Sequence, residues 1–204
     1  MQKDADSLPV PAHSSVVGGK SAVTVALQLL KRNRNIRWAT REGRMPASVM
    51  LSCLTLEVAG AGRTIGQNLR IIAQHILDQL LQAKSTGQLI HVENPRCPGD
   101  VFTDRWPENY AAQDAMIADM RLFLSQLAVL LDDRRSLRER REVLKSMFGE
   151  SIGEEVMDEL EQEYGEAIRT GNHAFGVTGG IAMSPAIANA KPAVKPSTFY
   201  GSKC

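Results

Sequence analysis

The sequence has few cysteines, no long apolar run and no signal peptide. The three cysteines, Cys53, Cys97 and Cys204, are an odd number and lie far apart, so they form neither a disulfide framework nor a zinc-binding pattern and favour a reducing compartment. No apolar run reaches the length that spans a membrane. Residues 1–10 lack the apolar core of a signal peptide. We therefore expect a soluble, cytoplasmic protein.

The sequence also lacks an excess of charge of either sign. Its 24 Lys plus Arg against 23 Asp plus Glu give a net charge of +1. This balance excludes a protein that is basic overall, so any site for nucleotides or nucleic acid must be a local patch. Apolar residues make up 43% of the 204 positions, which is typical of a globular protein and argues against wholesale disorder.

Apolar residues recur at helical spacing along most of the chain. The pattern predicts helices over 21–38, 46–59, 64–87, about 110–131, 136–148 and 151–169, with one candidate strand at 89–93. Capping sequences mark three of the starts: Thr64 with Gln67, Ser136 with Glu139, and Ser151 with Glu154. We therefore expect a mainly α protein, a bundle of about five helices with at most one short strand.

Composition divides the chain into three segments. Residues 1–19 are polar, carry prolines and glycines, and are expected to be an extended lead-in. Residues 20–170 form the helical domain. Residues 171–204 are rich in Gly, Ala and Pro without a periodic apolar face, so they cannot bury enough surface to offset their ordering entropy, and a flexible tail is expected.

The helix predicted from Pro46 differs from the others because its 49–59 stretch is apolar on nearly all sides. Such a helix belongs at the centre of a bundle. Proline suits the first helical position, where its missing N–H is not needed. Pro46 therefore places Ser48 in the first turn, where free backbone N–H groups and the helix dipole attract anions.

A basic cluster precedes this helix and is the first candidate site. Its six cations are Lys31, Arg32, Arg34, Arg37, Arg41 and Arg44, with one acid among them, Glu42. One interpretation is a helix C-terminus that complements its dipole, followed by a solvated loop. The other is a polyphosphate site, in which Lys31 at the end of one helix meets Ser48 at the start of the next.

The segment 94–106 is the second candidate. Its prolines make it rigid, and Trp106 ends it. It could stack on a nucleobase, or it could be a structural connection whose Trp106 fills the core. The four histidines share no ligand spacing, so we expect no metal site formed by them.

Five segments stand in a recognisable order. They are V-A-L-Q-L-L-K-R-N-R at 25–34, P-A-S-V-M-L-S-C-L-T-L at 46–56, N-P-x-x-P-G-D-x-F-x-D-R-W at 94–106, M-F-G at 147–149 and S-T-F-Y-G at 197–201. Together they resemble the bacterial cGAS/DncV-like (SMODS-type) nucleotidyltransferases. Enzymes of that family join nucleoside triphosphates into cyclic oligonucleotides in anti-phage signalling.

The resemblance maps onto the C-terminal helical half of the family's enzyme. It implies that Lys31 and Ser48 bind the nucleotide triphosphate, and that Arg34, at a commonly basic position, is a third candidate for binding it. The catalytic half, a β-sheet with a Gly-Ser pair and three carboxylates that hold Mg²⁺, has no counterpart in this sequence. We therefore expect no catalytic residue and no Mg²⁺ ligand in this chain, which would be a fragment, a truncated reading frame or one subunit of a split enzyme, inactive alone.

The resemblance also implies partners: nucleoside triphosphates and the missing N-terminal catalytic half or subunit. In some family members a ubiquitin-activation-like enzyme conjugates the C-terminus through a terminal glycine. Here three residues follow Gly201, which departs from that pattern. Two other functions stay open from the residues alone, a non-catalytic helical interaction module and an RNA-binding fragment that uses the basic cluster.

Overall fold

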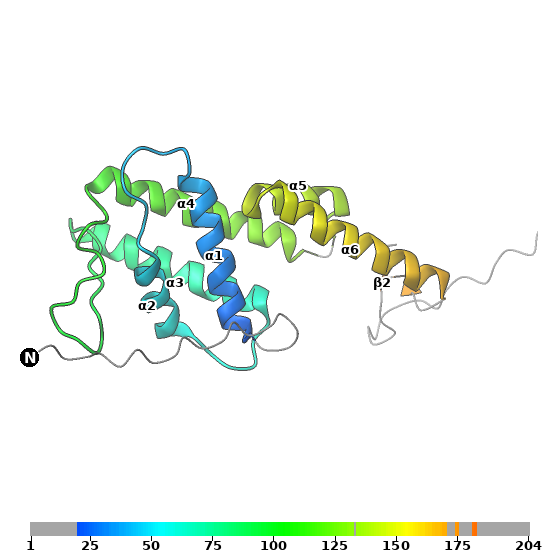
Figure 1. The fold of residues 1–204 in the computed structure, drawn as a ribbon, viewed down its shortest axis with the longest axis horizontal. Coiled ribbons are helices and arrows are strands. Elements are labelled where there is room, and N and C mark those ends of the chain that lie inside the picture. The colour runs from blue at the N-terminus through cyan, green and yellow to red at the C-terminus, as the bar shows by residue number, and fades with distance from the viewer. Residues whose placement is uncertain (1–19, 133, 171–173, 176–180, 183–204) are drawn as a thin grey trace, which may run out of the picture. The chain divides into compact units, whose positions relative to one another are not determined.

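The computed structural model describes residues 20–132, 134–170, 174–175 and 181–182, and these residues are mainly helical (Figure 1). The described helices are α1 (Ala22–Trp38), α2 (Ser48–Val58), α3 (Ile65–Ser85), α4 (Tyr110–Leu130), α5 (Leu137–Phe148) and α6 (Glu150–Arg169). The predicted mainly α fold is confirmed, with six described helices in place of about five.

The strand predicted at 89–93 does not form, apart from an isolated bridge between Glu93 and Val101. Side chains take the place of a partner strand there. The Ile90 N–H donates to Gln113 Oε1 at 2.7 Å and the Val92 N–H donates to Thr103 Oγ1 at 3.0 Å. The segment is therefore an extended connection that buries Ile90 and Val92 and exposes His91 and Glu93.

Two short strands occur where no regular structure was expected. β1 (Ala174–Phe175) and β2 (Ile181–Ala182) form an antiparallel pair within the predicted tail. The rest of that tail and the predicted lead-in at 1–19 lie outside the described residues.

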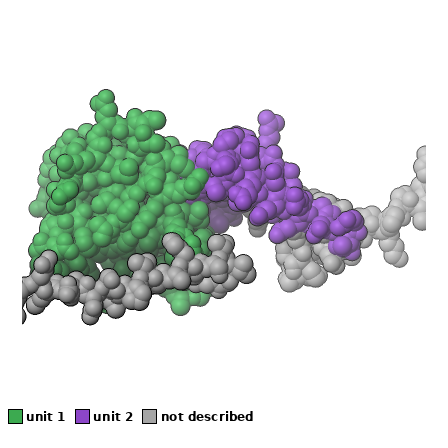
Figure 2. Space-filling model, viewed as in Figure 1, with its two compact units in different colours: residues 1–121 green, residues 122–204 purple. Residues whose placement is uncertain are grey.

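The chain divides into two compact units, residues 1–121 and residues 122–204 (Figure 2). In the first unit α1, α2 and α3 pack against one another. Their contact surface is formed by buried aliphatic side chains, among them Ala26, Leu30, Leu51, Leu54, Leu69, Ile72 and Ile76. In the second unit α5 packs against α6, and the buried side chains include Phe123, Leu127, Met147, Phe148 and Met157.

Side-chain caps fix most of the helix starts. The capping boxes predicted at Thr64 and Ser136 are both present, with the paired hydrogen bonds to Gln67 and Glu139. The cap predicted at Ser151 is wrong, because α6 already begins at Glu150. Gly149 explains the difference, since its φ of +96° ends α5 and turns the chain directly into the next helix.

Two predictions for α2 are wrong. The helix begins at Ser48 with Ala47 as its N-cap, so Pro46 precedes the helix instead of starting it. It also lies at the surface of its unit, because Val49 is 44% and Leu56 74% exposed. Apolar composition indicated burial on all sides, but the structure buries one face of the helix and leaves the other uncovered.

Candidate functional site

Lys31 is a residue of α1, and its side chain reaches α2 at Ser52. Its Nζ donates a hydrogen bond to Ser52 Oγ at 2.9 Å, and Ser52 Oγ donates to the Ser48 carbonyl oxygen at 3.0 Å. Burial, and secondarily the positive charge of Arg34, lower the pKa of Lys31. Lys31 lies in the middle of α1 and not at its end, and it reaches α2 at Ser52, one turn after the helix start, so a triphosphate contact of Lys31 together with Ser48 stays a prediction.

The N-terminus of α2 has no side-chain cap. Ala47 occupies the N-cap position and makes no side-chain hydrogen bond, unlike Ser21, Thr64 and Ser136 at the starts of α1, α3 and α5. The first-turn N–H groups of α2 thus have no side-chain acceptor from their N-cap. Exposed Ser48 adds a hydroxyl in the same turn. Unsatisfied N–H groups and the helix dipole together favour an anion at this end.

Arg34 is buried, with 6% of its surface exposed, and contacts protein acceptors. Its Nη1 donates to the Pro46 carbonyl oxygen at 2.7 Å, while Nε and Nη2 donate to Asn35 Oδ1 at 3.0 and 2.6 Å. Burial lowers its pKa. Through its hydrogen bond to Pro46 this side chain holds the segment that leads into α2. We therefore interpret Arg34 as a support for the start of α2.

The arginines that follow serve the fold. Asp119 of α4 is 3% exposed and binds Arg41 at 2.6 and 2.8 Å and Arg37 at 3.2 Å. Sequence reasoning did not single out Asp119. Its signal was an acid flanked by Met116 and Met120 on an otherwise apolar stretch, because a carboxylate there needs a cationic partner.

Trp106 is buried in the core and also forms part of the wall of a pocket. It is 2% exposed and packs edge to face on Trp38, with ring centroids 6.2 Å apart. Arg41 lies over the other ring at 4.8 Å from its centroid. The structural interpretation of this residue is confirmed by its burial and its packing on Trp38, and base stacking stays a prediction.

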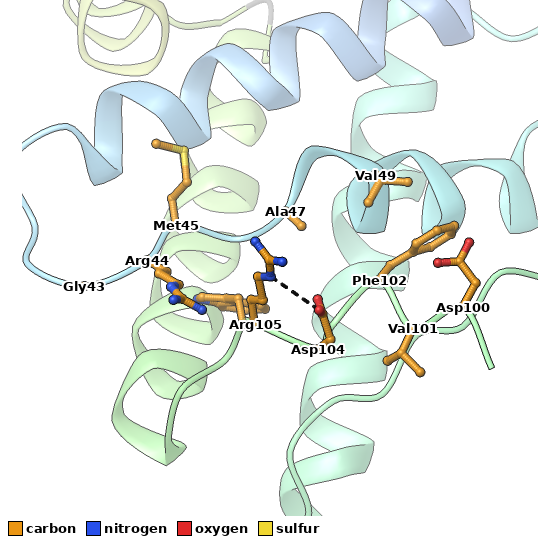
Figure 3. Close-up of a pocket in the computed structure, with 11 residues that line it drawn as sticks. Gly43, Arg44, Met45, Ala47, Val49, Asp100, Val101, Phe102, Asp104 and Arg105 are labelled. Carbon is orange, nitrogen blue, oxygen red and sulfur yellow. Dashed lines mark ion pairs between the residues drawn. The ribbon is translucent and has the colours of Figure 1, made fainter. Parts of the chain in front are cut away.

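A pocket of about 720 Å³ lies beside the N-terminus of α2 (Figure 3). The connection from α1 to α2 and the loop at 100–106 form its walls. Phe102, Val49 and Met45 make the apolar part, and the charged part comprises Arg44, Asp100, Asp104 and Arg105. The volume is within the range of small-molecule sites. Sequence reasoning singled out this loop for Trp106 and missed Phe102, which the structure places in the pocket wall.

The loop that carries Asp100 is closed by its own hydrogen bonds. Asn94 Nδ2 donates to Asp100 Oδ2 at 2.8 Å, and the Asn94 N–H donates to the Asp100 carbonyl oxygen at 2.8 Å. The Arg96 N–H donates to Asn94 Oδ1 at 3.0 Å. Asn94 thus fixes the shape of the loop, in keeping with a mainly structural role for this motif.

Within the described residues, no group of three or more His, Cys, Asp or Glu is placed to hold a metal ion. None of the described helices has both the length and the apolar composition needed to cross a bilayer.

Two comparisons with known proteins match the same relative, and a third finds no match. No family model matches the chain. The chain is 33% identical over 194 residues to the cyclic dinucleotide synthase CdnG of Bradyrhizobium diazoefficiens, an alignment that covers 94% of this chain and 46% of CdnG. The solved structure of that CD-NTase in complex with GTP matches with a TM-score of 0.63 and 35% identity, over 70% of this chain and 41% of CdnG.

These matches confirm the resemblance to the cyclic-oligonucleotide nucleotidyltransferases. The chain spans about half the length of the curated relative that it matches.

Proposed function

From this homology to a cyclic dinucleotide synthase, we propose that the chain is the helical, triphosphate-binding part of a nucleotidyltransferase that makes cyclic oligonucleotides from nucleoside triphosphates. The observation that carries the proposal is the position of Lys31, whose amine donates to Ser52, one turn after the uncapped start of α2. The GTP bound to CdnG in its solved structure supports a nucleoside triphosphate as the ligand.

The chemistry of this site suits the phosphates that leave during nucleotidyl transfer. Lys31 supplies a cation, Ser48 a hydroxyl, and the first turn of α2 backbone N–H groups and the positive end of its dipole. Negative charge grows on the pyrophosphate as the bond to the α-phosphate breaks. Preorganised donors stabilise such charge without reorganising during the reaction.

The pocket beside α2 provides the proposed base contacts. Phe102 offers a ring face, and bases stack on aromatic rings with little preference for sequence. Asp100 and Asp104 offer acceptors for base N–H groups. The pocket and the uncapped helix start share Ala47 and Val49 in their surroundings, so one nucleotide can reach both.

The absence of a group of three or more His, Cys, Asp or Glu among the described residues supports a Mg²⁺ site located elsewhere in the intact enzyme. We assign the metal and the reacting carboxylates to a catalytic half or subunit outside these 204 residues. The exposed apolar side chains of α2, Val49 and Leu56, support such a partner, because they lie seven positions apart on one helix face beside the phosphate site. Covering them would bring the catalytic part against the triphosphate.

The remaining parts of the proposal concern the cell. Nucleoside triphosphates are cytoplasmic metabolites, and such a substrate supports a cytoplasmic location for the protein. Anti-phage signalling is the role that the family resemblance implies. Conjugation of the C-terminus by a ubiquitin-activation-like enzyme stays a prediction, because residues 183–204 lie outside the described residues.

A chimaera tests the proposed function. The part of CdnG outside the aligned region is joined to this chain, and the products formed from ATP, GTP and Mg²⁺ are separated by chromatography. We expect cyclic product from the chimaera and none from this chain alone. A cyclic product made by this chain alone would contradict the assignment of catalysis to another part. A folded but inactive chimaera would contradict the proposed function itself.

A further inference from the structure

Ser52 connects Lys31 to the start of α2. Its hydroxyl has one proton, which it donates to the Ser48 carbonyl oxygen one turn earlier at 3.0 Å. Its oxygen is thereby left as an acceptor, and Lys31 Nζ donates to it at 2.9 Å. The three residues form a chain of hydrogen bonds that runs from α1 to the first turn of α2.

This connection limits where the lysine amine can be. A lysine side chain is a flexible four-carbon stem that ends in a compact charge. An ammonium group has three N–H donors, and Ser52 accepts one of them. Among the described residues the Lys31 amine donates to Ser52 alone, so two of its N–H donors remain for a ligand.

We propose that Ser52 is a positioning residue that holds the Lys31 amine beside the first turn of α2 for binding of the triphosphate. This inference rests on the proposed function and names the residue that makes its phosphate site rigid. Without the hydroxyl, Lys31 must be ordered by the ligand, and that ordering lowers the affinity. A hydroxyl that accepts from an ammonium also favours its charged form.

Other serines and threonines also donate to a carbonyl oxygen of the preceding helical turn. The hydrogen bond from Ser52 to Ser48 is therefore not enough to make Ser52 a positioning residue. Ser125 of α4 donates to the Leu122 carbonyl oxygen at 2.8 Å, and Thr55 donates to the Leu51 carbonyl oxygen at 2.7 Å. Neither has a lysine hydrogen bond like that of Ser52. Ser125→Ala is therefore a matched control that removes a similar backbone contact on another helix.

The test measures binding of inorganic tripolyphosphate to the full chain by calorimetry. We expect Ser52→Ala to raise the Kd about threefold to tenfold, because the interaction energy between contacting residues is of this order. Ser52→Thr, which keeps the hydroxyl, should restore the Kd. In the Lys31→Ala background, Ser52→Ala should change nothing further. Ser125→Ala should leave the Kd unchanged, and circular dichroism confirms that each variant is folded.

Each outcome decides between the two claims. An unchanged Kd in Ser52→Ala, or an equal loss with and without Lys31, would overturn the role of Ser52 while the phosphate site stands. No loss in Lys31→Ala would overturn the phosphate site and this inference together. A ligand-free readout is the amine resonance of Lys31 by NMR. Ser52→Ala should lower the pKa of this amine, Ser52→Thr should restore it, and an unaltered titration would overturn the inference.

Discussion

Lys31 differs from an ordinary surface lysine in its partial burial, and this affects both stability and binding. Burial and the nearby Arg34 lower its pKa, so the charged amine is less favourable in the folded state than in the unfolded chain. Below the folded pKa both states are protonated and folding carries the full penalty. As the pH rises from the folded pKa to the unfolded value, the unfolded state holds more protons and the protein gains stability.

The same titration predicts how phosphate binding depends on pH. We expect affinity for tripolyphosphate to fall as the pH rises through the lowered pKa of Lys31, because the neutral amine no longer attracts the anion. Calorimetric titrations across the alkaline range measure this fall. Lys31→Arg should retain affinity in the same range, since arginine stays charged. An identical decline in Lys31→Arg would show that another group is responsible.

Asp119 is a second residue whose effect can be measured alone. Asp119→Asn removes the charge that Arg37 and Arg41 share in a buried site. Because the two arginine side chains are 31% exposed and can be hydrated once unpaired, we expect the free energy of unfolding to fall by about 1–3 kcal/mol, to be measured by urea denaturation. Asp114→Asn is the control, because its ion pair with Lys84 is exposed and should matter little. Equal effects of the two variants would contradict the anchoring role of Asp119.

At the scale of elements, the start of α2 lacks a side-chain cap, and it is also where we propose that phosphate binds. Ala47→Ser supplies the missing N-cap oxygen, which typically stabilises a protein by about 1 kcal/mol. The new oxygen also occupies N–H groups that the phosphate would use, so tripolyphosphate affinity should fall while the melting temperature rises. Calorimetry and thermal denaturation measure the two effects. A rise in both quantities would show that the ligand does not use these N–H groups.

Helices α5 and α6 approach each other closely at Gly153. A Cβ atom there would lie 2.8 Å from the Lys145 backbone nitrogen and 2.9 Å from its Cα. Gly153→Ala should therefore destabilise the second unit by roughly 1–3 kcal/mol. Gly165→Ala on the same helix meets nothing within 4 Å and should stabilise it by about 0.5–1 kcal/mol. Thermal denaturation compares the two, and an equal response would contradict the close packing.

At the scale of the whole molecule, the features that could be predicted from the sequence are those set by residues close together in the chain. The starts of α3 and α5 follow from a cap and a Glu or Gln three positions later, and both are present. Lys31 and Ser48 lie on consecutive helices, so their proximity could be predicted from the bounds of those two helices. In the structure Ser52 links them. The mainly α fold followed from apolar periodicity.

What the sequence did not predict depends on contacts between distant parts of the chain. Composition cannot tell which face of α2 is covered, and Val49 and Leu56 turn out to be exposed. Asp119 pairs with arginines 78 and 82 positions away. Phe102 lines the pocket because its loop folds against α2, and no local pattern encodes that approach.

The central claim is that this chain binds the triphosphate of a nucleotide through Lys31. The most direct measurement is the Kd for GTP of the full chain and of Lys31→Ala, with Lys84→Ala as the control for an exposed lysine that is paired elsewhere. A charge-assisted phosphate contact of about 1.5–3 kcal/mol predicts a loss of about tenfold to a hundredfold for Lys31→Ala and no loss for Lys84→Ala. Unchanged GTP affinity in a folded Lys31→Ala variant would contradict the account.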